Sequence, residues 1–230
     1  MMRTISLQAL LGAGTVAVVA MAGTSSAEAI SLYTSDGAFT STVGATTIDF
    51  SGAPLGPSSY TENGVTYSGS GGFVQGSVSG QFAAPPSQLP EYNNTNNTYL
   101  TLGGINEPGP VSITLPGLSN YFGLYWGSVD AYNFIEFFKK GVSVGIFNGN
   151  QVINGANGDQ QVNGARYVNF TSSSSSDYFD SIVLRSTSAA FESDNHAFRE
   201  VPTPALLPGL IGLGVAALRR KQDETAEENA

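Results

Sequence analysis

Short runs of β-branched and aromatic residues recur through the middle of the 230-residue chain, and turns rich in Gly, Asn and Ser separate them. Runs of this kind with frequent turns are typical of the strands of a sandwich or barrel. The predicted strands span residues 46–50, 64–67, 73–78, 99–102, 111–115, 121–126, 132–138, 142–147, 166–170, 179–185 and 189–198. We therefore predict an all-β body in which two antiparallel sheets pack against each other.

The clearest alternation lies in residues 121–138, which we predict to form a β-hairpin. Its first arm alternates between a core-facing set, Phe122, Leu124 and Trp126, and an outward-facing set, Tyr121, Gly123 and Tyr125. The turn contains Asp130, whose carboxylate can accept hydrogen bonds from nearby backbone amides. One short N-terminal helix is expected at residues 35–42. The predicted body is similar to jelly-roll or galactose-binding-like modules.

The N-terminus has the three parts of a secretory signal peptide. Arg3 supplies a positive charge, residues 7–21 are apolar except for two polar side chains, and Ala27-Glu28-Ala29 fits the small-x-small cleavage pattern. We predict that export removes residues 1–29 and leaves Ile30 as the first residue. A retained membrane helix is the alternative, but no basic flank follows the apolar run.

A second apolar run, residues 205–218, lies near the C-terminus and contains no charged or polar side chain. Its length as a helix is roughly 21 Å, shorter than the ~30 Å hydrocarbon core of a bilayer. Arg219, Arg220 and Lys221 follow at once, and such a cluster holds its end of a helix on the cytoplasmic side. We expect a short membrane helix, with a buried core helix as the alternative.

The segment Val201-Pro202-Thr203-Pro204-Ala205, the apolar run and the basic cluster together resemble a PEP-CTERM sorting signal, most closely its PTPA variant. The resemblance implies a surface protein processed by an exosortase, a membrane enzyme that would recognise Pro202, Thr203, Pro204 and Ala205. The body would be anchored transiently in the inner membrane and then reach the outer envelope or the medium. The predicted regions are a signal peptide (1–29), a β-sandwich body (30–200), a sorting signal (201–221) and an acidic tail (222–230), which the usual PEP-CTERM chain lacks.

The composition excludes several kinds of chemistry. Residues 30–200 carry 13 acidic and 5 basic residues, which disfavours nucleic acid as a partner. The chain has no Cys and a single His, His196, so thiol catalysis, Cys-ligated zinc and a multi-histidine metal site are excluded. No nucleophile elbow or phosphate-binding loop is present. We interpret His196 as a structural strand residue, and expect neither a catalytic residue nor a bound cofactor.

Acidic residues leave two further interpretations open. Glu192 and Asp194 lie two apart and share a face of a predicted strand, where they and Asp49 could hold a structural calcium ion. The alternative is that they are plain surface acids. Glycoside hydrolysis needs only two well-placed carboxylates, and the chain has many.

Three function classes remain: a glycan-binding surface protein, a polysaccharide hydrolase and an ice-binding protein. Exposed aromatic faces with amide neighbours bind sugars. The candidates for such a site are Tyr121, Tyr125, Tyr92 and Asn93. The alternative is that the tyrosine rings are packed in the protein and only their hydroxyls reach the rim. We predict an exported, non-enzymatic surface or extracellular-matrix protein, with Tyr121 and Tyr125 as its glycan platform. A secreted polysaccharide hydrolase using Glu192 and Asp194 is the alternative. An ice-binding protein is a third, for which only Thr40-Ser41-Thr42 fits the expected threonine array.

Overall fold

A computed structural model describes residues 30–57, 59–86, 96–103 and 109–202. The predicted signal peptide, Thr203 to Lys221 of the sorting signal and the acidic tail lie outside these residues. No helix within the described ranges is long and apolar enough to cross a bilayer.

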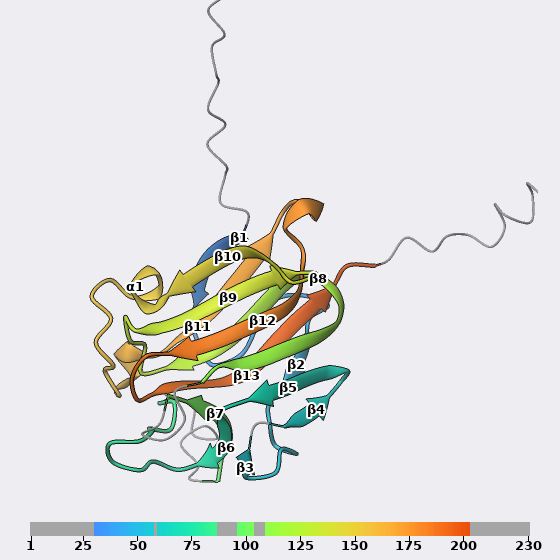
Figure 1. The fold of residues 1–230 in the computed structure, drawn as a ribbon. Coiled ribbons are helices and arrows are strands. Elements are labelled where there is room, and N and C mark those ends of the chain that lie inside the picture. The colour runs from blue at the N-terminus through green and yellow to red at the C-terminus, as the bar shows by residue number, and fades with distance from the viewer. Residues whose placement is uncertain (1–29, 58, 87–95, 104–108, 203–230) are drawn as a thin grey trace, which may run out of the picture.

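The described residues are mostly β-strand and contain almost no helix, as the sequence predicts (Figure 1). The strands are β1 (Ile30–Ser35), β2 (Thr46–Ile48), β3 (Gly56–Pro57), β4 (Tyr60–Glu62), β5 (Val65–Gly69), β6 (Gly72–Gln75), β7 (Thr98–Leu102), β8 (Val111–Gly127), β9 (Asn133–Lys139), β10 (Val142–Asn148), β11 (Arg166–Ser172), β12 (Phe179–Ser186) and β13 (Phe191–Glu200). Three single-turn helices lie between them, α1 (Gly149–Val152), η2 (Val162–Gly164) and η3 (Ser175–Asp177).

The long strand β8 belongs to both layers of the sandwich. Its first half pairs with β12 and β5, and its second half pairs with β11 and β13. The first layer therefore runs β10-β9-β12-β8-β5-β4, and the second contains β1, β11, β8, β13, β2, β7, β6 and β3. All pairings are antiparallel. The two-sheet prediction is confirmed, with the addition that one strand joins the sheets.

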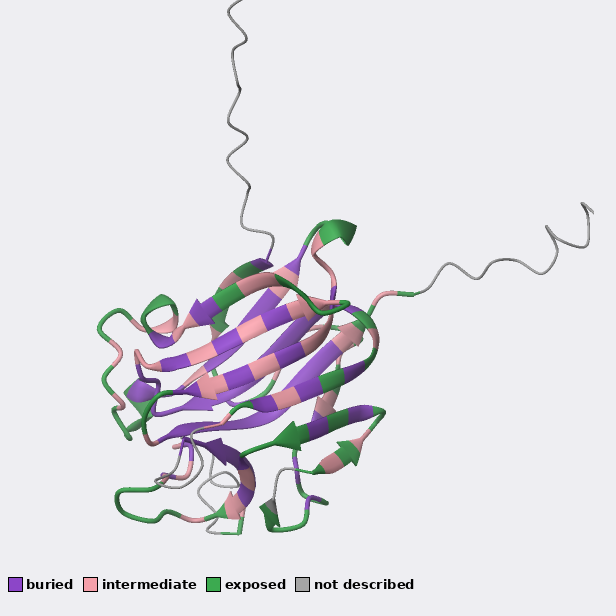
Figure 2. Ribbon diagram, in the orientation of Figure 1, coloured by how far each residue is buried: buried purple, intermediate pink, exposed green. Residues whose placement is uncertain are grey.

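The hydrophobic core lies between the layers. Phe137 of β9 contacts Phe170 of β11, with ring centroids 4.9 Å apart. Trp126 is fully buried and stacks on Phe191 at 4.4 Å. Phe122, Leu124 and Trp126 all belong to this core, as their alternation predicts, and β9 and β12 show the same alternation of buried and more exposed residues (Figure 2). Burial of these aromatic side chains supplies much of the stability.

The predicted helix at residues 35–42 is wrong. Ser35 ends β1 and bends follow, with Gly37 at φ +83°, a backbone conformation that interrupts a helix. The segment instead packs on the outer face of the second layer. There the Ala38 carbonyl accepts a hydrogen bond from the Asn195 side chain at 2.8 Å, and Thr40 Oγ1 lies 2.6 Å from the Tyr121 hydroxyl. These contacts across the sheet outweigh the weak helical pattern.

The predicted hairpin over residues 121–138 is also wrong, although both of its arms are strands. β12 lies between β8 and β9, so the two arms do not pair with each other. β9 pairs instead with β10, through a turn in which Lys140 and Gly141 both have positive φ, the conformation that two-residue hairpin turns require. The loop after β8 is held elsewhere, because Val129 N–H donates to the Gly164 carbonyl at 2.8 Å.

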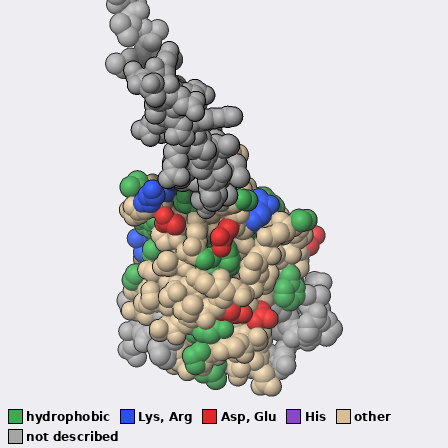
Figure 3. Space-filling model, turned by 90° about the vertical axis from the view of Figure 1, so that its right-hand side faces the viewer, with side chains coloured by type: hydrophobic (Ala, Val, Ile, Leu, Met, Phe, Trp, Pro, Cys, Tyr) green, Lys and Arg blue, Asp and Glu red, His purple; other side chains and the backbone are tan. Residues whose placement is uncertain are grey.

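Charged residues make up only 12% of the chain. On the face drawn in Figure 3 they lie scattered among uncharged groups, and the described residues form no basic patch there.

Candidate functional site

The two tyrosines predicted as a glycan platform are buried. Tyr121 is 0% exposed and Tyr125 is 4% exposed. The Tyr121 hydroxyl donates to Asn169 Oδ1 at 2.7 Å, and the Tyr125 hydroxyl donates to the Pro86 carbonyl. Both face away from the core as predicted, but residues 36–45 and 83–86 cover that face of β8. The platform prediction is therefore wrong. Tyr92 and Asn93 lie outside the described residues.

The three calcium candidates do not form a metal site. Asp49 is exposed and caps a turn by accepting from Ser51 N–H at 3.0 Å. Asp194 is buried and accepts from the Asn97 side chain at 2.7 Å and from Asn195 N–H at 2.6 Å. Across the described ranges, no group of three or more His, Asp or Glu residues is arranged to hold a metal ion. The alternative of plain surface acids is also wrong for Asp194 and Glu192, because both are buried.

His196 is a core residue with satisfied ring nitrogens. Nδ1 lies 3.1 Å from the Tyr67 hydroxyl, and Nε2 lies 2.9 Å from Ser193 Oγ. Its ring contacts Phe50 and Phe122 edge-on. Complete burial lowers the pKa of His196 to about 3, so the imidazole is neutral at physiological pH. The structural interpretation holds, although the residue lies in the core rather than at an edge.

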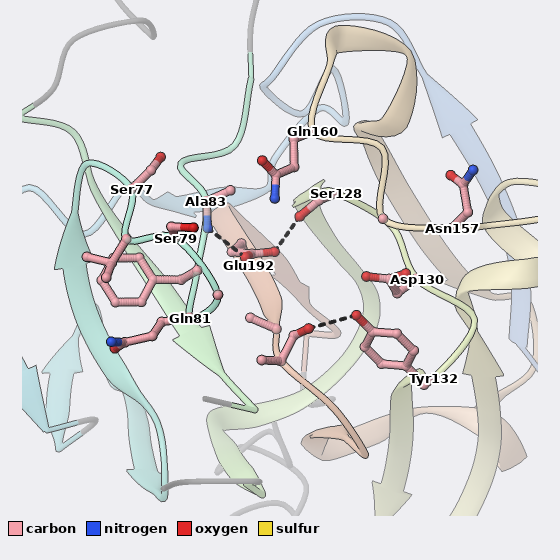
Figure 4. Close-up of a pocket in the computed structure, with 16 residues that line it drawn as sticks. Ser77, Ser79, Gln81, Ala83, Ser128, Asp130, Tyr132, Asn157, Gln160 and Glu192 are labelled. Atoms are coloured by element: carbon pink, nitrogen blue, oxygen red, sulfur yellow. Dashed lines mark hydrogen bonds between the residues drawn. The ribbon is translucent and has the colours of Figure 1, made fainter. Parts of the chain in front are cut away.

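A pocket of about 570 Å³ opens beside the first residues of β13 (Figure 4). It lies between the loop after β6 (77–83), the loop after β8 (128–132) and the loop at 157–160. Its lining is polar: the carboxyl groups are Asp130 and Glu192, the amides Gln81, Asn157 and Gln160, and the hydroxyls Ser77, Ser79, Ser128 and Tyr132. A volume of this size is within the usual range of small-molecule sites.

Glu192 lies at the base of this pocket, where two loops hold it. Its Oε1 accepts from Ala83 N–H at 2.9 Å, and its Oε2 accepts from Ser128 Oγ at 2.5 Å (Figure 4). The residue is only 3% exposed. Burial raises the pKa of Glu192 to about 7, although the hydrogen bonds from Ser128 and Ala83 act in the opposite direction and the charge of Asp130 adds to the rise. Glu192 can therefore hold or release a proton near neutral pH.

Asp130 supplies the second carboxyl group of the pocket. It is 8% exposed, and burial raises its pKa, while the neighbouring Tyr132 lowers it. The Tyr132 hydroxyl donates to the Ala189 carbonyl at 2.8 Å, which fixes the ring at the pocket wall. Gly158 packs so closely that a Cβ there would lie 2.6 Å from Asp130 Oδ2. The loop geometry thus depends on glycine at position 158.

Comparisons with known proteins add little to this picture. No protein-family model matches the sequence, and no curated protein does. Two solved structures show a low similarity. One is the catalytic unit of a thermostable GH87 alpha-1,3-glucanase from Streptomyces thermodiastaticus strain HF3-3, with TM-score 0.35, 13% identity, and coverage of 71% of this chain and 28% of that one. The other is a GH87 alpha-1,3-glucanase catalytic domain in complex with tetrasaccharides, with TM-score 0.28, 16% identity, and coverage of 66% and 30%.

This chain therefore spans less than a third of either glucanase structure.

The sequence analysis paired Glu192 with Asp194, whereas the structure places Asp130 in the same pocket as Glu192. Asp130 was expected to stabilise a turn, and its carboxyl group instead lines the pocket with Glu192. The two residues are far apart in sequence, and they meet because β13 pairs with the end of β8, with Glu192 opposite Gly127. The available signal was an acidic residue in the loop directly after the predicted strand 121–126, a position where binding residues often lie.

Proposed function

We propose that this chain is an exported, non-enzymatic protein of the cell surface or extracellular matrix that binds a glycan in the pocket of Glu192 and Asp130. The observation that carries the proposal is the lining of that pocket. Carboxyl, amide and hydroxyl groups converge there beside the rings of Tyr132 and Phe82. Sugars present many hydroxyl groups and one apolar ring face, so polar partners with an aromatic neighbour suit them.

The two chain ends support the location. The predicted signal peptide would direct the body out of the cytoplasm, and the PTPA-like motif would make it a substrate of an exosortase. Peptide mass analysis of the cell-envelope form tests both, because Ile30 should be its first residue and the segment after the motif should be missing. Recovery of peptides from residues 1–29 would contradict the export proposal.

Affinity gel electrophoresis of the full chain with a panel of envelope polysaccharides tests the binding. We expect at least one polysaccharide to retard the protein without producing new reducing ends. Asp130→Asn, which preserves shape and removes a charge, should weaken the retardation. Asp36→Asn is the matched control, because it removes the same charge from an exposed position outside the pocket. Retardation that both variants weaken equally would mean that the pocket is not the site.

A second candidate function is hydrolysis of a polysaccharide by Glu192 and Asp130. The specific observation is that a carboxyl group with a pKa of about 7 shares a pocket with a second carboxyl group. A protonated acid and an ionised partner are the minimum set for glycoside cleavage. Asp194 does not line the pocket, so it drops out of the proposed pair. New reducing ends that disappear in Glu192→Gln and in Asp130→Asn, but persist in Asp36→Asn, would establish this activity.

A further inference from the structure

The carboxyl groups of the pocket have no basic counterpart among the residues that the structure describes. None of the described lysine and arginine side chains lines the pocket. Four of these side chains have partners elsewhere: Lys139 donates to the Ser175 carbonyl, Arg166 donates to the Ala165 carbonyl, Arg199 donates to Asn120 Oδ1, and Arg185 forms an ion pair with Glu136. The fifth, Lys140, is exposed in the turn after β9. Asp130 and Glu192 are therefore two buried carboxyl groups for which the described residues supply no ion-pair partner.

Such a pocket selects its ligand by charge. Taking a carboxylate out of water is unfavourable, and a cation that enters with hydrogen-bond donors compensates for it. An anionic sugar such as a uronate would place a further negative group beside Asp130 and the partly ionised Glu192, and would be repelled. A bare metal ion is not favoured, because the residues within the described ranges supply no group of three or more metal-ligating side chains. An organic ammonium group needs only two or three acceptors.

We infer that the pocket recognises an amino sugar with a free ammonium group, such as the glucosamine units of a de-N-acetylated hexosamine polysaccharide. This inference rests on the proposed glycan binding and specifies its ligand. The ammonium donates to Asp130 and to a free lone pair of Glu192, whose two oxygens each accept one protein hydrogen bond already. The ring hydroxyls face the amides and hydroxyls of Gln81 and Gln160 and of the serines that line the wall. N-acetylation would replace the cation by a bulkier neutral amide.

Isothermal titration of the full chain at neutral pH tests the inference with four probes: a glucosamine tetramer, its N-acetylated counterpart, a galacturonate tetramer and spermidine. Hydrogen bonds to charged groups are stronger than neutral ones. We therefore expect the glucosamine tetramer to bind at least tenfold more tightly than the N-acetylated tetramer. Asp130→Asn should reduce that preference to about threefold or less, and the control Asp36→Asn should retain it.

Proton release provides an independent measurement. A bound ammonium favours the ionised form of Glu192. At about pH 6, where most amino groups of the glucosamine tetramer already carry their proton, binding should therefore release protons, measured as a difference in heat between two buffers of different ionisation enthalpy. Glu192→Gln should abolish the release, while Asp36→Asn should leave it unchanged. Binding without proton release would overturn the placement of the ammonium beside Glu192.

The outcomes separate this inference from the proposed function. Equal affinity for the two hexosamine tetramers, or tighter binding of the N-acetylated one, would leave glycan binding intact and refute the amino-sugar specificity. Spermidine binding as tight as that of the glucosamine tetramer would show a general cation site and would also refute it. If the glucosamine tetramer does not bind, the specificity is refuted. If, in addition, no polysaccharide of the gel panel binds, the proposed function is refuted as well.

Discussion

Replacing Glu192 with Gln should remove a buried ionisation that destabilises the folded chain above neutral pH. Burial raises the pKa of Glu192 from 4.5 to about 7, and a tenfold difference in proton affinity corresponds to about 1.4 kcal/mol. Ionising Glu192 therefore costs roughly 3 kcal/mol more in the folded than in the unfolded chain. Because the folded chain binds the proton more tightly, protonated Glu192 stabilises the fold. This stabilisation is fully present below pH 4.5 and is lost as the pH rises through 7.

Denaturant titrations of the natural protein and of Glu192→Gln at several pH values measure this contribution. The Gln side chain retains an oxygen that accepts from Ala83 N–H and an amide that donates to Ser128 Oγ, so the hydrogen bonds of the site remain. The difference in unfolding free energy, Gln variant minus natural protein, should increase by roughly 3 kcal/mol between pH 4 and pH 8. Asp36→Asn controls for the change in net charge. A difference that is independent of pH would refute the assignment of Glu192 as a desolvated acid.

Three other predictions follow from the same structure. Trp126→Ala should lower the unfolding free energy by about 3–5 kcal/mol, because the side chain is fully buried against Phe191; an unchanged thermal midpoint would contradict the packing. In the Glu192→Gln variant, the unfolding free energy should fall by about 2 kcal/mol from pH 7 to pH 5, because His196 becomes protonated in the unfolded chain while burial keeps it neutral in the folded chain. Denaturation curves that coincide at the two pH values would contradict this role of His196. Replacing residues 202–205 by Ala and Gly should leave the protein in the inner membrane with its tail, as membrane fractionation and mass analysis can show, and normal release would mean that the motif is a linker.

Local patterns in the sequence predicted the strands but not how they pair. The alternation of Phe122, Leu124 and Trp126 correctly placed three side chains in the core, because side-chain direction in a strand depends only on position along it. Pairing depends on residues far away in the chain. β12 enters between β8 and β9 some fifty residues after the turn at 127–131, and no local signal in residues 121–138 announces it.

The candidate site escaped prediction for a related reason. Alternation tells which face of β8 Tyr121 and Tyr125 occupy, but it does not tell what covers that face. Residues 35–42 of the covering segment were predicted to form a helix, and Tyr121 and Tyr125 were predicted to be exposed. Likewise, the acidic character of Asp130 and Glu192 is visible in the sequence, but their shared pocket results from pairing between β8 and β13 and from the loop at 77–83.

The position of β13 bears on how the body would carry mechanical load. This strand is bordered by β8 on one side and by β7 and β2 on the other, and it ends directly before Val201, where the predicted sorting segment begins (Figure 1). Hydrogen bonds between antiparallel strands lie perpendicular to the strand direction. A pull applied at Val201 along the axis of β13 would therefore shear both rows of bonds at once instead of unzipping them one by one. A body tethered at this end would transmit drag from the surrounding fluid through β13, which is paired on both sides. The same strand carries Glu192 near its other end.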